Sequence, residues 1–186
     1  MTPGTAADDR ACRHPYLRDA RRMALADGPG VHEPREELNR LARSAAFALE
    51  VPFTLITIIG AELQWVIGAH GLVNPLIGER WSPLQGSISK YVVIDRRPVV
   101  LGDRRLDRRL SRVDSEYLGG MIAYAGVPLV TADGYAIGAA CAIDMVPHRW
   151  TTAEVTVLTD VATAAMDVLA PAASNGRAVV GGRSLP

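Results

Sequence analysis

Cysteine is scarce in this sequence, and long apolar runs are missing from it. Cys12 and Cys141 are too few for a framework of disulfides, which favours a reducing, cytoplasmic location. No early apolar run resembles a secretion signal, and no stretch reaches the roughly 20 apolar residues of a membrane helix. The 20 acidic and 20 basic residues cancel, so we expect neither nucleic acid nor a membrane as a partner.

The residues that are present indicate one globular domain between two loose ends. The chain has 186 residues, 48% of them apolar and 22% charged, which is ordinary for a protein with a sizeable core. Residues 1–32 are polar and Arg-rich and contain Gly28-Pro29-Gly30, which predicts a flexible tail. Residues 171–186 start at Pro171 and are rich in small and polar residues, which predicts a disordered tail. The domain is therefore placed at residues 33–170.

Two helices are expected to bracket a sheet. Residues 33–51, "EPREELNRLARSAAFALEV", carry apolar side chains at helical spacing, and Pro34 suits a first helical position. Residues 151–171, "TTAEVTVLTDVATAAMDVLAP", begin with Thr151-x-x-Glu154, which is typical of a capping box. Pro171 is expected to end this second helix.

Five β-rich runs and one short helix lie between the two helices. The runs are "FTLITII", "LQWVIGA", "PVVLG" and the two halves of the hairpin "AYAGVPLVTADGYAIGAACAID"; the short helix is "SISKYVV". Alternation along the hairpin places Tyr124 and Gly126 on one face and Ala125 and Val127 on the other. The many small residues either let helices pack closely or leave room for a ligand.

Five segments in order resemble a bacterial GAF domain over roughly residues 34–170. They are "LQWVIGAHGL", "SISKYVV", "RPVVLGD", the hairpin, and "PHRWTTAEVTVLTDVA". The resemblance implies an α+β fold, with a central antiparallel sheet of five to six strands and the first and last helices on one face. It also implies a small-molecule pocket on the other face, under the middle segment. By the family's pattern Tyr124, Ala139, Cys141 and Ile143 face that pocket.

The candidate ligand site takes its residues from the middle segment and the pocket strands. We expect apolar walls, hydroxyl groups that orient a polar ligand, and a floor of small side chains, none of them catalytic. The predicted residues are Trp81, Ser87, Ser89, Tyr91, Asp103, Tyr117, Tyr124, Ala139 and Cys141. Asp103 can also cap the turn that follows it. The alternative is that all of these residues are core and bind nothing.

Defined GAF chemistries leave signatures that this sequence lacks. Residues 60–120 contain no cysteine, so neither a methionine sulfoxide reductase thiol pair nor a bilin attachment site is expected. The Asn-Lys-Phe-Asp-Glu signature of cyclic-nucleotide GAF domains is also missing. The four histidines are scattered and expected to be exposed, so no metal and no cofactor is predicted.

The run "DRRLDRRLSRVDSE", residues 103–116, interleaves arginines with acids. It is either a solvated, salt-bridged surface or a source of arginines that clamp an anionic ligand at the pocket mouth.

Three functions remain open on the sequence. The first is a sensory or regulatory module that binds an unidentified small molecule and acts through a separate output protein or a dimer. The second is a biosynthetic enzyme that has adapted the GAF pocket, although no nucleophile and base can be paired. The third is a ligand-free dimerisation module. A homodimer is expected because both terminal helices have alanine-rich flanks and GAF domains commonly pair through them.

Overall fold

The computed structural model describes residues 10–71, 80–107 and 120–174, which form an α+β fold around one six-stranded antiparallel sheet. The strand order is β3-β2-β1-β6-β5-β4, so β3 and β4 are the edge strands. The elements are η1 (Pro15–Arg18), α2 (Ala20–Ala26), α3 (Glu36–Leu49), β1 (Phe53–Ile59), β2 (Leu63–His70), β3 (Trp81–Pro83), η3 (Leu84–Gly86), α4 (Ser89–Asp95), β4 (Val99–Leu101), η4 (Arg104–Leu106), β5 (Ala123–Val130), β6 (Ala136–Asp144) and α6 (Thr152–Ser174). The predicted fold class is confirmed, and β3 is the sixth strand.

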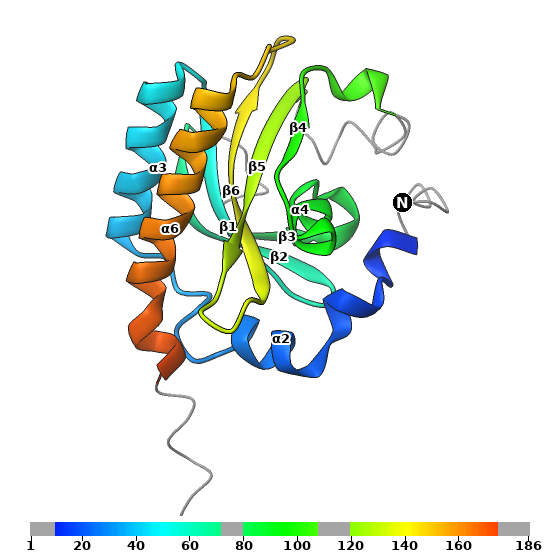
Figure 1. The fold of residues 1–186 in the computed structure, drawn as a ribbon, viewed down its shortest axis with the longest axis vertical. Coiled ribbons are helices and arrows are strands. Elements are labelled where there is room, and N and C mark those ends of the chain that lie inside the picture. The colour runs from blue at the N-terminus through cyan, green and yellow to red at the C-terminus, as the bar shows by residue number, and fades with distance from the viewer. Residues whose placement is uncertain (1–9, 72–79, 108–119, 175–186) are drawn as a thin grey trace, which may run out of the picture.

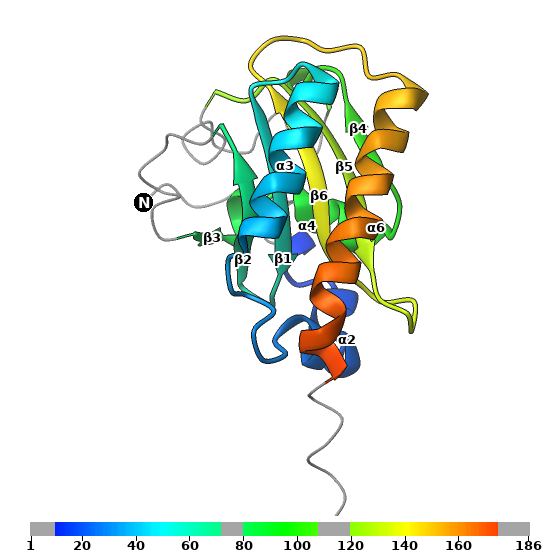
Figure 2. The same ribbon diagram turned by 90° about the vertical axis from the view of Figure 1, so that its left-hand side faces the viewer.

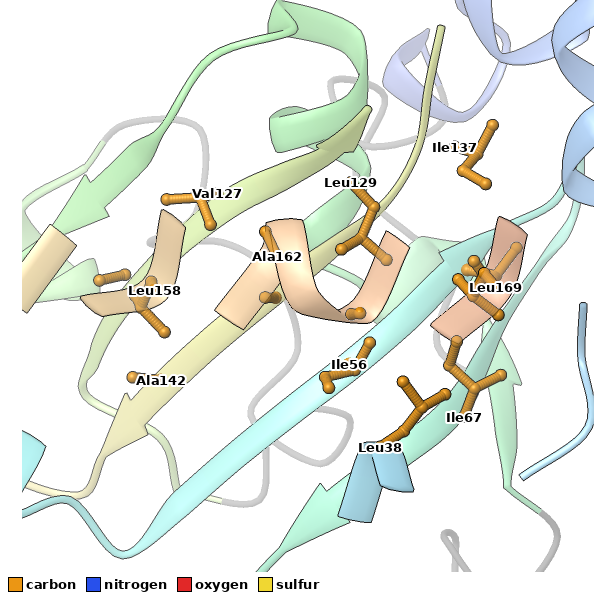
Figure 3. Close-up of a cluster of buried hydrophobic side chains, with 14 of the residues drawn as sticks. Leu38, Ile56, Ile67, Val127, Leu129, Ile137, Ala142, Leu158, Ala162 and Leu169 are labelled. Atoms are coloured by element: carbon orange, nitrogen blue, oxygen red, sulfur yellow. The ribbon is translucent and has the colours of Figure 1, made fainter. Parts of the chain in front are cut away.

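The helices α3 and α6 lie side by side on one face of the sheet, as the family resemblance implied (Figures 1 and 2). Their buried side chains and those of four strands form the larger apolar core (Figure 3). Small strand residues permit this close contact: a Cβ on Gly68 would lie 2.7 Å from the Cβ of Leu38. Burial of this apolar surface is the main force that holds the helices to the sheet.

The alternation predicted for the β5–β6 hairpin is confirmed. Ala125, Val127 and Ala142 belong to the core under α3 and α6. Tyr124 and Cys141 belong to a second apolar cluster, which packs on the opposite face with residues of α4. The hairpin therefore sends small residues to both faces, one toward the long helices and the other toward the candidate site.

The helix boundaries differ from the sequence prediction at two places. The α3 helix begins at Glu36 with Arg35 as its N-cap, so Pro34 precedes the helix.

The capping box of α6 is confirmed: the Glu154 N–H donates to Thr151 Oγ1 (3.3 Å), and the Thr151 N–H donates to Glu154 Oε2 (2.7 Å). However, α6 continues to Ser174, so the prediction that Pro171 ends it is wrong. Proline has a helix-compatible φ, and one missing N–H near a helix end does not stop the last turn.

The N-terminal segment differs most from the structure that the sequence predicts. Residues 10–32 were expected to be a flexible tail, but they contain η1 and α2 and pack on the sheet with Leu17, Arg22 and Ala26 fully buried. Arg22 donates from Nη1 to the Leu17 carbonyl oxygen (3.1 Å) and from Nη2 to that of Ile59. The Tyr16 hydroxyl accepts from the Ala136 N–H (2.9 Å).

Two physical features explain why the sequence did not predict an ordered N-terminal segment. Helices of four and seven residues are too short to show a convincing apolar period. A buried arginine whose Nη atoms donate to backbone carbonyls also resembles a surface arginine in a sequence. Residues 1–9 and 175–186, where the remaining tail predictions fall, lie outside the described residues.

Over the described part of the chain, no helix has both the length and the apolar character needed to cross a bilayer.

Candidate ligand-binding site

A buried group of polar side chains lies where α4 covers the β5–β6 hairpin. The hydroxyl oxygens of Ser89 and Tyr124 are 3.1 Å apart, and the thiol of Cys141 lies beside both side chains. Ser89 is the first residue of α4, while Tyr124 and Cys141 project from neighbouring strands. All three are almost inaccessible to solvent, with Tyr124 and Cys141 each 1% exposed. We call these three residues the hydroxyl–thiol cluster.

Gly126 explains how a residue as large as Tyr124 fits here. A Cβ on Gly126 would lie 2.7 Å from Cζ of Tyr124, so the ring lies over the glycine along the same strand. Gly126 also pairs with Cys141 in the β5–β6 register. The space left by this glycine is therefore filled by a side chain of the protein, which places the hydroxyl group beside the thiol and Ser89.

Burial determines the protonation state of the cluster. Burial raises the pKa of Tyr124 well above its ordinary value, and the neighbouring Cys141 raises it further. Burial also raises the pKa of Cys141 to about 11, although hydrogen bonds with Ser89 and Tyr124 partly lower it. At neutral pH both groups are therefore protonated, and Cys141 is a neutral thiol with little nucleophilic character.

Ala139 and Tyr91 complete this part of the predicted site. Ala139 is fully buried and projects from β6 into the same apolar cluster as Tyr124. Tyr91 of α4 belongs to that cluster as well and is 7% exposed. The structure thus brings together five predicted residues: Ser89, Tyr91, Tyr124, Ala139 and Cys141.

Ser87 is close in sequence to Ser89 but is engaged elsewhere. Its hydroxyl donates to Oε1 of Gln64 on β2 (2.5 Å) and accepts from the Lys90 N–H (3.3 Å). Through these two bonds Ser87 links the first turn of α4 to β2. Ser87 and Ser89 are both predicted site residues, but only the Ser89 hydroxyl lies within hydrogen-bond distance of Tyr124.

Trp81 and Asp103 lie at opposite edges of the sheet. Trp81 is in β3, where it pairs with Trp65 and is 37% exposed. Asp103 follows β4 and caps η4 through the Arg105 N–H (3.0 Å). A hydrogen bond from the Arg105 side chain lowers the pKa of Asp103. Capping was the alternative role for Asp103, and the structure shows it. Tyr117 lies outside the described residues.

Lys90 is a structural residue that the sequence analysis did not single out. It is fully buried, and its Nζ donates to the carbonyl oxygens of Leu84 (3.0 Å) and Gln85 (2.8 Å). These bonds fix η3 against α4. One feature of the sequence points to it: Lys90 is the only lysine in the chain, and every other basic residue apart from the histidines is arginine.

A second site, also missed, centres on His148. Its Nδ1 lies 3.0 Å from Oδ2 of Asp144, and its Nε2 lies 2.8 Å from Oε1 of Glu154. The expectation that His148 is exposed is wrong, since 19% of its side chain is accessible. It borders an open groove of about 650 Å³ lined by Val100, Leu101, Gly102, Asp103, Leu106, Asp107, Pro147, His148 and Arg149.

Nothing in the residues that the structure describes forms a group of three or more His, Cys, Asp or Glu side chains able to hold a metal ion.

Comparison with known proteins agrees with this architecture. A family model described as the GAF domain matches residues 33–169. The chain is 30% identical over 140 residues to a cyclic di-GMP phosphodiesterase from Pseudomonas aeruginosa, a match that covers 72% of this chain and 23% of that protein. The chain therefore spans about a quarter of the length of this curated relative.

Solved structures show the same fold at low identity. One is the GAF domain of a phosphoenolpyruvate-protein phosphotransferase from Acinetobacter, with TM-score 0.62, 16% identity, and coverage of 92% of this chain and 98% of that one. Another is the free methionine-R-sulfoxide reductase of Neisseria meningitidis in complex with its substrate, with TM-score 0.58, 12% identity, and coverage of 91% and 89%.

Proposed function

The chain belongs to the GAF domain family, and we propose that it is a sensory or regulatory module whose ligand is a small molecule bound between α4 and the β5–β6 hairpin. Its output is proposed to pass through a homodimer or a separate partner protein. GAF domains commonly bind small molecules and act with output domains. The match covers 23% of the cyclic di-GMP phosphodiesterase, so it does not support the same activity for this chain.

The hydroxyl–thiol cluster is the observation that carries this proposal. A purely structural core at this position gains most from apolar side chains, since buried polar groups cost free energy unless they are paired. Here two hydroxyl groups and a thiol meet on the sheet face opposite the long helices, among small residues such as Ala139. Hydroxyl groups that bond to each other can exchange that bond for one to a polar ligand atom at little net cost.

The protonation state of the cluster favours binding over catalysis. Both Tyr124 and Cys141 are neutral at physiological pH because burial raises their pKa values. Neutral hydroxyl and thiol groups suit an uncharged polar atom of a ligand, such as a carbonyl oxygen, which accepts a hydrogen bond. A covalent role for Cys141 would need a thiolate, which this environment disfavours.

A second candidate function is a ligand-free interaction module. The packing around Tyr124 and Ala139 favours it, because these side chains are almost completely buried against other residues of the chain. In that case the hydroxyl–thiol cluster is part of the core, and its hydroxyl groups only pair with each other.

Two substitutions separate the candidates. Tyr124→Phe removes one hydroxyl and keeps the ring, so a bound ligand that uses the hydroxyl loses about 1 kcal/mol of affinity. Ala139→Leu adds volume where a ligand would lie. If the site is a binding pocket, Ala139→Leu leaves the thermal midpoint nearly unchanged and abolishes binding. If the site is filled core, overpacking lowers stability by about 1–3 kcal/mol and no ligand is detected for any variant.

A further inference from the structure

The His148 site contains a single imidazole held between two carboxylates from different elements. Asp144 is the last residue of β6, Glu154 lies in the first turn of α6, and His148 lies in the loop between them. Each ring nitrogen is within 3.0 Å of a carboxylate oxygen. Only the protonated ring has an N–H on both nitrogens, whereas the neutral ring must turn a lone pair toward one carboxylate. This geometry therefore selects the imidazolium.

The two carboxylates are fixed by other bonds and cannot easily turn away. Asp144 Oδ1 accepts from the Met145 N–H (2.7 Å), and Glu154 Oε2 accepts from the Thr151 hydroxyl (2.7 Å). When His148 loses its proton, one carboxylate must therefore face a lone pair or recruit water. The loss of the proton weakens one of the two contacts between His148 and the carboxylates, whereas the bond between Thr151 and Glu154 at the helix start remains.

The ring of His148 is also held from its face and through its backbone. The Trp150 ring stacks on it, with centroids 3.9 Å apart and planes inclined by 23°. Trp150 Nε1 donates to the Leu101 carbonyl oxygen (3.1 Å), and the His148 N–H donates to that of Gly102 (3.0 Å). The site thus joins β4, β6 and the start of α6 in one set of contacts.

We propose that Asp144, His148 and Glu154 form a proton-dependent clasp, which ties the first turn of α6 to the sheet when His148 is protonated and loosens it when His148 is neutral. The clasp is separate from the hydroxyl–thiol cluster and does not require a ligand there. It acts on α6, the long helix that packs on β5 and α3. A change in pH would therefore alter how firmly this helix is anchored.

The charges around His148 support this direction. Partial burial alone lowers the pKa of His148, but the bonds to Asp144 and Glu154 outweigh it and leave the pKa above 6.5. Asp103 and Asp107 line the same groove and favour the proton, whereas Arg149 opposes it. Asp103 is partly neutralised by Arg105. Because the folded-state pKa is raised, the clasp is fully closed below about pH 6.5 and is lost as pH rises through the higher folded value.

Nuclear magnetic resonance titration of the full chain tests the proposal, together with amide hydrogen exchange of residues 152–156 from pH 6 to 9, corrected for intrinsic rates. We expect His148 to titrate above 6.5 and exchange in the first turn of α6 to become about three- to tenfold faster across that transition. His148→Gln should remove this dependence. His70→Gln, which alters a histidine that faces no carboxylate among its described contacts, should behave like the wild type.

Asp144→Asn covers the case in which His148→Gln does not fold. It keeps the Oδ1 acceptor for the Met145 N–H but replaces the charged partner of His148. We expect the proton affinity of His148 to fall about three- to tenfold in this variant, because one partly exposed carboxylate is lost. The proposal is overturned if His148 titrates at or below 6.5 in the wild type. It is also overturned if exchange in residues 152–156 has the same pH dependence in the wild type and in His148→Gln.

Discussion

The ring of Tyr124 lies over Gly126, two residues further along β5, at a place where any Cβ would come within 2.7 Å of Cζ of the ring. This relationship positions the Tyr124 hydroxyl at Ser89 and joins α4 to the sheet. The ring cannot move aside freely because Tyr124 is 1% exposed and surrounded by packed side chains. The glycine is therefore a steric requirement of the candidate site.

Gly126→Ala should displace the Tyr124 ring and lower the free energy of unfolding by about 1–3 kcal/mol, the usual cost of overpacking. Urea unfolding measures the loss. In a Tyr124→Ala background the same substitution should cost far less, because the ring it would strike is gone. Equal costs in the two backgrounds would show that the ring and the glycine are not coupled.

Arg22 leads to a second prediction, about the N-terminal segment. Arg22→Met should destabilise the protein by about 2–3 kcal/mol, because the carbonyl groups of Leu17 and Ile59 lose charged donors in a buried setting. Limited proteolysis should then cut within residues 10–32. Arg21→Gln is the control, since Arg21 is exposed and its contact with Asp133 (3.6 Å) is worth little. If both variants resist protease as the wild type does, the segment does not depend on Arg22.

Assembly supplies a third prediction. The proposed homodimer uses α3 and α6, and Phe47 on α3 is 71% exposed, so its ring is accessible to a second copy. Light scattering at tens of micromolar should report a dimer, and Phe47→Glu should shift it toward monomer by desolvating a charge in the interface. Val130→Glu alters another exposed apolar residue, at the end of β5, and should leave the dimer intact. A monomeric wild type would refute the prediction.

Much of the fold could be predicted from the sequence because its long elements have clear periods. The helix stripes and the strand alternation of the hairpin placed Ala125 and Tyr124 on the correct faces. The GAF resemblance then placed α3 and α6 on one side of the sheet.

The rest depends on contacts that a linear pattern does not contain. Arg22 is buried through bonds to carbonyl groups distant in sequence, and His148 acquires its role only when β6 and α6 bring two carboxylates to it. For the same reason, only part of the candidate site could be predicted. Small residues signalled space in the hairpin, but the sequence could not show that Tyr124 fills the space above Gly126.

The most direct test of the central claim is native mass spectrometry of the full chain after incubation with a low-molecular-mass bacterial cell extract. The proposed function predicts that one small molecule adds to the wild type, is released on denaturation, and binds more weakly to Tyr124→Phe. It also predicts that the molecule does not bind to folded Ala139→Leu. A wild type that binds no small molecule, or binding that Ala139→Leu leaves unchanged, would contradict a ligand site between α4 and the β5–β6 hairpin.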